Sequence, residues 1–411
     1  MNRRATRFLL NAVLLSVSLA AGLGISELVL RHFTAFPIHA PMGNRVFDDR
    51  LLYRMDSNLA GIDAAGFRNP ESYGTDFPRV AAIGDSFTYG YNVSREASWP
   101  GRLEAAIGER VYNFGVGGYS LLQYVDLVRM AAEAGSRTIV VGLLPENDMA
   151  VCDAAQLTFW NGLLSDKEGE GHLLADFCSL SPDRQRPTAR QVFDDFNSNK
   201  NIDLETRLFD HSAVGSALRY AVDAVVNRRD NLSKNRFFDH NDLTRATGAC
   251  ADPQTDFIFP VFGTKDFIPG FHKNDLRYFE AFGKTDATAR AVFRRAVAGM
   301  KHHAQANRAG LVFLIIPGRR RVVSHVLAAS RREVTQPDWM ISLAASEDRL
   351  VAMMREELQA LDLPEADALP LSAAAYEASA RQGHPHYPCF DGHPLEAGYQ
   401  ALADTVVGLV Q

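Results

Sequence analysis

The sequence lacks an excess of basic charge. Among its 411 residues, 43 Lys and Arg stand against 49 Asp and Glu, which gives a formal net charge of −6. No nucleic-acid partner is therefore predicted, because broad nucleic-acid binding needs a basic surface. The sequence also contains no internal repeat and no low-complexity tract, and 46% of its residues are hydrophobic. A disordered, collagen-like or coiled-coil protein is excluded, because there is ample apolar material for a globular core.

Cysteine is scarce as well. The four cysteines are Cys152, Cys178, Cys250 and Cys389. None of them forms a CxxC pair with the spacing of zinc ligands, so no metal site is predicted. In an oxidising compartment an even number of cysteines indicates disulfides, and three pairings are possible. We favour Cys152–Cys178 with Cys250–Cys389, the first pair being local in sequence, and four buried free thiols are the alternative.

A long apolar segment is present at the N-terminus. Residues 8–25 are almost entirely apolar and follow three arginines within the first seven positions. About 20 apolar residues cross a bilayer as a helix, and basic residues in front of it favour a cytoplasmic N-terminus. We therefore predict a signal anchor or transmembrane helix within residues 1–32, with the rest of the chain on the periplasmic side of a bacterial inner membrane. The alternative is a cleaved signal peptide and a secreted protein, with the small residues Ala20-Ala21 at the cleavage site.

Strand and helix patterns alternate from residue 79 onward. Nearly continuous apolar runs, typical of strands buried on both faces, predict strands at 80–83, 111–114, 138–144 and 311–316. Helical spacing is found at 99–107, 121–133, 287–307, 346–361 and 396–410. This alternation predicts an α/β fold with a doubly wound parallel sheet.

The domain is predicted in two parts. Residues 33–78 form a tether and lead-in, 79–150 the first part of the sheet domain, and 286–411 the second part. Residues 151–285 between them are loop-rich, with one helical pattern near 213–226. A structureless loop of that length is implausible, so we expect an insertion with structure of its own.

Four short motifs carry groups that could do chemistry. Each has an ordinary structural explanation, as a helix cap or a turn, when taken alone. The first lacks the Gly-x-Ser-x-Gly spacing of a nucleophile elbow, and the second lacks a dinucleotide fingerprint, so no cofactor is predicted. The motifs are Gly84-Asp85-Ser86-Phe87-Thr88-Tyr89-Gly90, Asn113-Phe114-Gly115-Val116-Gly117-Gly118-Tyr119-Ser120, Leu144-Pro145-Glu146-Asn147-Asp148 and Asp391-Gly392-His393-Pro394-Leu395-Glu396-Ala397-Gly398.

Together the motifs are more informative than any of them alone. Each follows a predicted strand or precedes a predicted helix, so in a parallel sheet the four loops converge on one edge. They supply a serine nucleophile, donors for an oxyanion, a histidine base and an acid to orient it. These are the groups that acyl transfer requires.

The order of the four motifs resembles the SGNH (GDSL-type) hydrolase superfamily. The resemblance covers residues 79–150 and about 287–411 and implies a flavodoxin-like SGNH fold. It implies Ser86 as nucleophile and first oxyanion donor, Gly118 (rather than Gly115) and Asn147 as the other donors, His393 as base and Asp391 as its partner. The spacing of one residue between Asp391 and His393 is similar to a membrane-linked branch with alginate and peptidoglycan O-acetyltransferases. Many other members have two residues there, and the glycine that often precedes the asparagine is absent here.

The predicted function is that of a serine esterase or deacetylase. It would remove acyl groups, with acetyl as the expected one, from an extracytoplasmic carbohydrate or envelope ester. An O-acyltransferase using the same residues and an inactive glycan-binding or assembly module are the alternatives.

Two further features admit a functional and an ordinary explanation. His384 and His386 are rival bases or substrate contacts, or else solvated loop residues. Arg319-Arg320-Arg321 is an anion-binding cluster for a glycan, or else a charged surface turn.

Overall fold

The computed structural model describes about half of the chain, mainly in the two parts of the predicted sheet domain. The four cysteines and residues 213–226 lie outside the described residues, so the predicted disulfides and that helix stay predictions. The described residues are 18, 21–26, 45–59, 61–70, 76–148, 190, 193, 257–261, 264–268, 286–329, 338–382, 384, 386–387 and 392–411.

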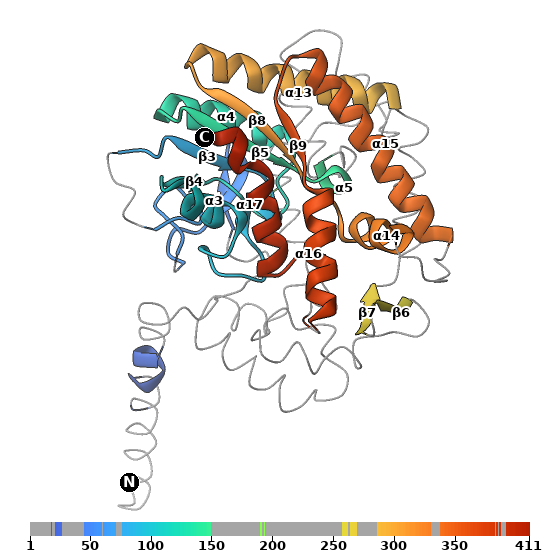
Figure 1. Ribbon diagram of the computed structural model, residues 1–411. Helices are drawn as coiled ribbons and strands as arrows, with labels where there is room; N and C mark the ends of the chain where they lie inside the picture. Colours follow the sequence, from blue (N-terminus) through green and yellow to red (C-terminus); the bar gives the residue numbers. More distant parts are fainter. Residues whose placement is uncertain are drawn as a thin grey trace, which may run out of the picture.

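A five-stranded parallel sheet forms the centre of the molecule (Figure 1). Its spatial order is β4-β3-β5-β8-β9, so the first strand along the chain lies between the second and the third. This is the flavodoxin-like order, and it confirms the predicted parallel α/β class. The strands are β3 (Val80–Ile83), β4 (Val111–Asn113), β5 (Thr138–Leu143), β8 (Gly310–Ile315) and β9 (Glu365–Asp367).

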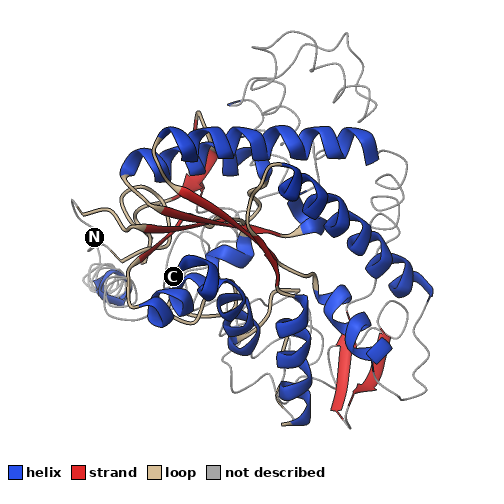
Figure 2. Cartoon of the chain, turned by 45° about the horizontal axis from the view of Figure 1, so that its top comes forward, coloured by secondary structure: helices blue, strands red, loops and turns tan. Residues whose placement is uncertain are grey.

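Helices cover both faces of this sheet, as Figure 2 shows, so the sheet is doubly wound. On one face α4 (Leu121–Ala134) packs against α13 (Asp286–Ala306), which also contacts α15 (Asp338–Ala360). On the other face α3 (Trp99–Ile107) packs against α17 (Glu396–Val410). The apolar residues of β3, β5 and β8 alternate between these two cores, which explains why their sequences are apolar throughout.

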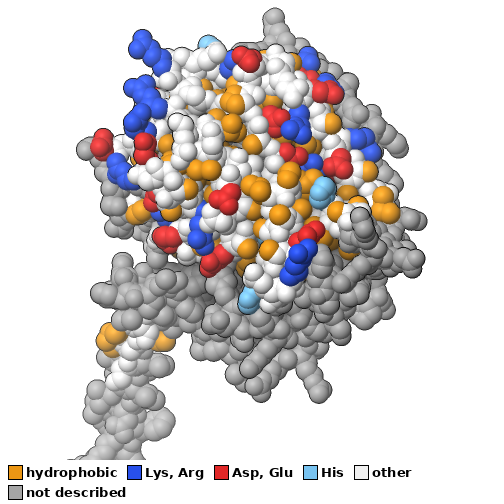
Figure 3. Space-filling view, viewed as in Figure 1, with side chains coloured by type: hydrophobic (Ala, Val, Ile, Leu, Met, Phe, Trp, Pro, Cys, Tyr) orange, Lys and Arg blue, Asp and Glu red, His pale blue; other side chains and the backbone are white. Residues whose placement is uncertain are grey.

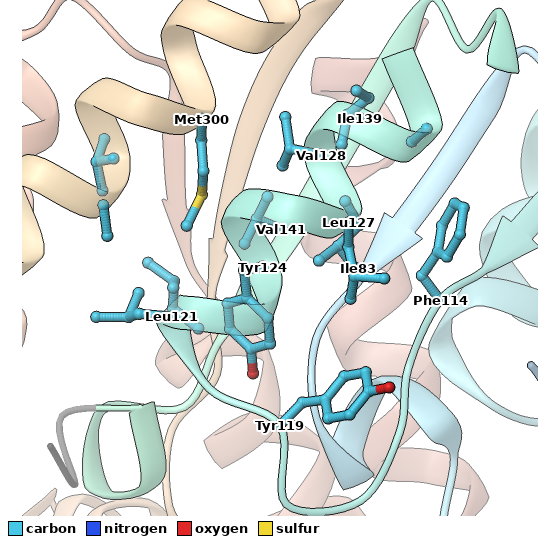
Figure 4. Close-up of a cluster of buried hydrophobic side chains, with 14 of the residues drawn as sticks. Ile83, Phe114, Tyr119, Leu121, Tyr124, Leu127, Val128, Ile139, Val141 and Met300 are labelled. Atoms are coloured by element: carbon cyan, nitrogen blue, oxygen red, sulfur yellow. The ribbon is translucent and has the colours of Figure 1, made fainter. Parts of the chain in front are cut away.

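The core between the sheet and α4 extends to the edge that carries the candidate motifs (Figure 4). Leu127 and Val128 of α4 pack there with Ile139 and Val141 of β5, and all four side chains are fully buried. Dense packing of this kind holds the strand ends rigid, so the loops that follow them have a fixed starting point.

The lead-in folds onto the sheet domain. The strands β1 (Arg45–Asp48) and β2 (Leu52–Met55) form an antiparallel hairpin. Its residue Tyr53 is buried in the core that also contains α4. Further along, the side-chain amide of Asn69 accepts from the backbone N–H of Asn113 at 2.8 Å and donates to its carbonyl at 3.1 Å. This pair of hydrogen bonds is the pattern a neighbouring strand would provide, and it covers Asn113 at the outer edge of β4.

The arginine cluster of the second half does not follow the sequence prediction. Arg319-Arg320-Arg321 begins the helix α14 (Arg319–Ala329), so the surface turn was a wrong interpretation. Arg321 is buried, with bonds to Asp367 at 3.0 and 3.2 Å and to Asp348 at 2.7 Å. This guanidinium is bonded to carboxylates of the same chain, one largely buried and one exposed, which contradicts the anion-binding explanation for it.

The helix α16 (Leu369–Arg381) and the strand β9 were not predicted either. Within the segment 151–285, the described residues include a hairpin of β6 (Phe257–Val261) and β7 (Thr264–Ile268).

No helix in the described part of the chain is long and apolar enough to cross a membrane. Of the predicted anchor in residues 1–32, positions 18 and 21–26 are described, and they are helical. The rest of that prediction lies outside the described residues.

Candidate active site

Ser86 stands at the start of a short helix that follows the central strand β3. This helix is α2 (Ser86–Tyr89), and Asp85 caps it by accepting a hydrogen bond from the backbone N–H of Phe87 at 2.9 Å. The preceding Gly84 leaves no room for a side chain, because a Cβ there would lie 2.0 Å from Oγ1 of Thr88. The sharp strand-to-helix turn therefore depends on glycine at this position and presents the serine at the carboxyl end of the strand.

His393 contacts Ser86 across 307 positions of sequence. Its Nε2 lies 2.6 Å from the serine Oγ, within hydrogen-bonding distance. Two aromatic rings flank the imidazole, with Phe87 at 4.5 Å and Tyr91 at 5.0 Å between ring centroids. The backbone carbonyl of His393 accepts from Nδ2 of Asn92 at 3.3 Å. The two rings hold the imidazole and the hydrogen bond from Asn92 holds the backbone of His393. The imidazole thus lies within reach of the hydroxyl that it would deprotonate.

The loop that carries His393 is closed by a backbone hydrogen bond. The N–H of Leu395 donates to the carbonyl of His386 at 2.8 Å. Asp391, predicted as the partner of the histidine, lies outside the described residues.

His386 is a buried residue, which corrects the interpretation of it as solvated. Its Nδ1 lies 3.3 Å from Oγ of Ser379, and its ring packs between Tyr376 and Tyr387. Burial, with a smaller contribution from the positive charge of Arg319, lowers the pKa of His386 to about 3. His386 is therefore neutral at ordinary pH. The neighbouring His384 is exposed.

The glycine-rich turn follows β4, next to β3 in the sheet. At its start the N–H of Gly115 donates to Oδ1 of Asn113 at 2.7 Å, and a Cβ on Gly115 would lie 2.2 Å from the backbone nitrogen of Tyr89. Further on, a Cβ on Gly117 would lie 2.8 Å from the hydroxyl of Tyr91. Gly118 has φ of +82°, a conformation that favours glycine, and is exposed. The turn thus runs close to α2 and to the tyrosine that stacks on His393.

Asn147 lies in the short helix α5 (Pro145–Asp148), which follows β5 on the other side of β3. Its side chain is outside what the structure describes. The adjacent Asp148 is buried and closes the turn: Oδ2 accepts from the N–H of Leu144 at 2.7 Å and Oδ1 from the hydroxyl of Tyr124 at 2.8 Å. Burial raises the pKa of Asp148 well above its usual range, and the charge of Asp85 adds to this. The hydrogen bonds of Asp148 thus fix the turn in which Asn147 lies.

The three predicted oxyanion positions follow adjacent strands, as the sequence indicated. Sequence reasoning missed the residues that brace them: Asp148, Asn69, and the hairpin residues Arg45 and Tyr53. Asp148 stands beside Asn147 in the motif, so a buried carboxylate one position after the asparagine was the available signal. The hairpin contacts gave no signal, because they link segments 64 and 72 positions apart.

The described residues contain no group of His, Cys, Asp and Glu side chains arranged to hold a metal ion. On the face seen in Figure 3, basic and acidic side chains are interspersed around uncharged ones. On the described residues, the site consists of a serine hydroxyl and a histidine imidazole within hydrogen-bonding distance, beside a glycine-rich turn.

Comparison with known proteins gives a distant structural likeness. No family model matches the sequence, and no curated protein matches it. Among solved structures, a protein named as a lipolytic protein of the G-D-S-L family from Desulfitobacterium hafniense DCB-2 is 10% identical, with a TM-score of 0.34. That alignment covers 80% of this chain and 98% of that one. The structural neighbours thus include a GDSL-family protein.

A second solved structure is 13% identical, with a TM-score of 0.31, and the alignment covers 80% of this chain and 94% of that one.

Proposed function

We propose that the protein is a serine esterase of the SGNH type. The observation that carries this proposal is the 2.6 Å separation between Nε2 of His393 and Oγ of Ser86. The two residues lie near opposite ends of the domain in the sequence, and the fold brings them together at the carboxyl end of the strand β3. A hydrogen bond from a serine hydroxyl to a neutral imidazole is the arrangement that activates serine as a nucleophile.

The reaction proceeds in two halves. His393 takes the proton of Ser86 as Oγ attacks the ester carbonyl, and the carbonyl electron pair moves onto oxygen. The tetrahedral intermediate collapses, the alcohol leaves with the proton held by His393, and an acyl-serine is formed. Water, deprotonated by His393, then attacks the acyl carbon. The bond between that carbon and Oγ breaks, the acid is released, and Oγ of Ser86 takes the proton back from His393. Asp391 is proposed to orient the imidazole throughout.

The developing oxyanion needs donors already in place. We propose the N–H groups of Ser86 and Gly118 and the side chain of Asn147. Gly118 is favoured over Gly115, because the N–H of Gly115 already donates to Asn113. One such donor is worth about 10²- to 10³-fold in turnover.

The proposed substrate is an extracytoplasmic carbohydrate or envelope component that carries an ester-linked acyl group. Acetyl is the expected acyl group. The N-terminal apolar segment supports this location, since it would place the site outside the cytoplasm whether or not it is cleaved. Transfer of the acyl group to a glycan hydroxyl would use the same residues. Product analysis with and without a glycan acceptor separates the two: free acetate alone indicates an esterase, and acetylated glycan a transferase.

Covalent labelling of Ser86 by a fluorophosphonate probe tests the proposal. The wild-type chain is expected to label and to hydrolyse p-nitrophenyl acetate, and Ser86→Ala is expected to do neither while keeping its thermal unfolding temperature. Ser94→Ala is the matched control, since Ser94 lies in the same segment and accepts a hydrogen bond from Ala97 instead. Labelling and hydrolysis retained in Ser86→Ala would contradict the assignment. Absence of labelling in the wild type would favour an inactive glycan-binding or assembly module.

A further inference from the structure

The carbonyl of Gly117 receives two hydrogen bonds from the lead-in hairpin. Nη2 of Arg45 donates to it at 2.6 Å and the hydroxyl of Tyr53 at 3.1 Å. Arg45 and Tyr53 come from β1 and β2, which lie outside the sheet that carries the proposed catalytic residues. The hairpin therefore reaches directly into the glycine turn.

This carbonyl belongs to the same peptide unit as the N–H of Gly118. The peptide is trans, so its C=O and N–H point in opposite directions. Two donors that hold the oxygen on one side therefore fix the direction of the N–H on the other side. Hydrogen bonds to the oxygen also polarise the unit, and each adds about 10–30% to the strength of the next bond in the chain. A charged donor such as a guanidinium has a larger effect than a neutral one.

The two donors are themselves held in place. The guanidinium of Arg45 lies over the ring of Tyr53, 4.0 Å from its centroid. Tyr53 is buried, and its backbone carbonyl accepts from the hydroxyl of Tyr119 at 2.5 Å. The arrangement is close-fitting on the turn as well, because a Cβ on Gly118 would lie 2.9 Å from the Tyr53 hydroxyl.

We infer that Arg45 and Tyr53 are positioning residues for the oxyanion hole, which orient and polarise the Gly117–Gly118 peptide so that the N–H of Gly118 is a stronger donor. This inference rests on the proposed function, because it assigns the hairpin to the same reaction. The charge of Arg45 then acts through one peptide on the transition state, where negative charge develops, more than on the neutral ester of the ground state.

The test compares Arg45→Met, Arg45→Lys and Tyr53→Phe with Arg54→Met as the matched control. Arg54 lies in the same hairpin but bonds to Asp48 at 2.7 Å and to the carbonyl of Ala65 at 3.0 Å. With p-nitrophenyl acetate, Arg45→Met is expected to lower kcat about 10- to 100-fold and to change KM less than twofold. This loss in kcat is smaller than that expected for removing a whole oxyanion donor, because the N–H of Gly118 remains. Tyr53→Phe is expected to lower kcat about fivefold, since its bond is longer and uncharged. Arg45→Lys is expected to recover part of the loss, and Arg54→Met to keep wild-type kcat.

A second readout separates positioning from general structural support. Phenylboronic acid, which forms a tetrahedral anion on an active serine, should be bound more weakly by Arg45→Met in the same proportion as kcat falls. A KM that rises at unchanged kcat would overturn the inference, because Arg45 would then contact substrate. A kcat unchanged in Arg45→Met, or lowered as much in Arg54→Met, would also overturn it. A wild-type chain that neither hydrolyses the ester nor reacts with fluorophosphonate removes the proposed function and this inference together, whereas an active wild type with unaffected variants removes only the inference.

Discussion

The rings of His393 and Tyr91 are stacked, with an interplanar angle of 24° and 5.0 Å between their centroids. Tyr91 is held in turn by the hydroxyl of Tyr399 in α17, which donates to its backbone carbonyl at 3.0 Å. The plane of the imidazole is therefore set by a ring that belongs to the segment after the serine helix. Because an aromatic face attracts a cation, this stacking also favours the imidazolium that forms when His393 takes a proton.

Tyr91→Leu is expected to lower kcat about 5- to 10-fold, because an exposed or partly buried cation–π contact contributes about 1 kcal/mol or somewhat more. Steady-state hydrolysis of p-nitrophenyl acetate measures the change. Tyr91→Phe keeps the ring and should retain most of the activity. Equal losses in both variants would show that the hydroxyl, and not the stacked ring, is what matters.

Substitutions in the glycine turn should separate stability from turnover. Gly115→Ala places a Cβ 2.2 Å from the nitrogen of Tyr89 and 2.5 Å from the carbonyl carbon of Thr88. Both are backbone atoms of the serine helix, so we expect a loss of about 2–3 kcal/mol in the free energy of unfolding. Urea denaturation gives that value directly, and an unchanged midpoint would contradict the packing described for this turn.

Gly118→Ala meets the Tyr53 hydroxyl and a positive φ, so its main effect is expected on the oxyanion donor, with kcat about 10- to 100-fold lower. Gly108→Ala is the matched control for the backbone strain alone. Gly108 has φ of +69°, and a Cβ there would have nothing within 4 Å. If both variants lose the same activity, Gly118 has no special part in the reaction.

The buried imidazole of His386 should make stability depend on pH. Its pKa is lowered to about 3 in the folded chain, against about 6.5 when unfolded. Between these values the unfolded chain binds a proton that the folded chain does not. The free energy of unfolding is therefore unaffected by this group above pH 6.5 and falls as the pH is lowered towards 3. His386 contributes up to about 1.4 kcal/mol per pH unit to this fall.

Urea denaturation between pH 4 and pH 7 compares the wild type with His386→Asn, which is expected to show the shallower slope. His384→Asn, at an exposed neighbouring position, is expected to keep the wild-type slope. A wild-type slope in His386→Asn would mean that some other group accounts for the acid sensitivity.

The buried arginine of α14 should matter for stability and not for turnover. Arg321→Met leaves Asp367, whose side chain is 12% exposed, without its bidentate partner. We expect a loss of about 3 kcal/mol in the free energy of unfolding, with kcat unchanged in the folded protein. The double variant Arg321→Met with Asp367→Leu should recover much of that loss, since neither charge is then buried alone. A large increase in KM for an anionic glycan ester in Arg321→Met would instead support the interpretation that Arg321 binds an anion.

The sequence predicts those elements whose stability is local or uniformly apolar. The strand β8 is apolar at consecutive positions, and α3 begins at the cap Ser98, whose side chain accepts from the N–H of Gly101. In contrast, β9 has three half-buried residues, Glu365–Asp367, and depends on pairing with β8 and on Arg321. Such an element is fixed by tertiary contacts, which local patterns do not contain.

The same division holds for the candidate site. Ser86 and His393 stand in recognisable motifs, and the structure brings them into contact. The contacts of Arg45 and Tyr53 with the glycine turn are made possible only by the folding of the lead-in onto β4. Their residue types carry no chemical signature in the sequence, so only the spatial arrangement reveals them.

The hydrogen bonds between the side-chain amide of Asn69 and the backbone of Asn113 determine where a shortened version of the protein should begin. A fragment that begins at residue 76 keeps every strand of the parallel sheet and the bonds of Glu104 and Arg95 to Val111, yet it removes the partner of the N–H and C=O of Asn113 at the outer edge of β4. Unpaired backbone groups at a sheet edge can pair with other chains, so such a fragment is expected to self-associate more than the longer chain. Soluble domains for crystallisation or assay should therefore begin before Arg45, even where a boundary drawn at the first sheet strand looks natural.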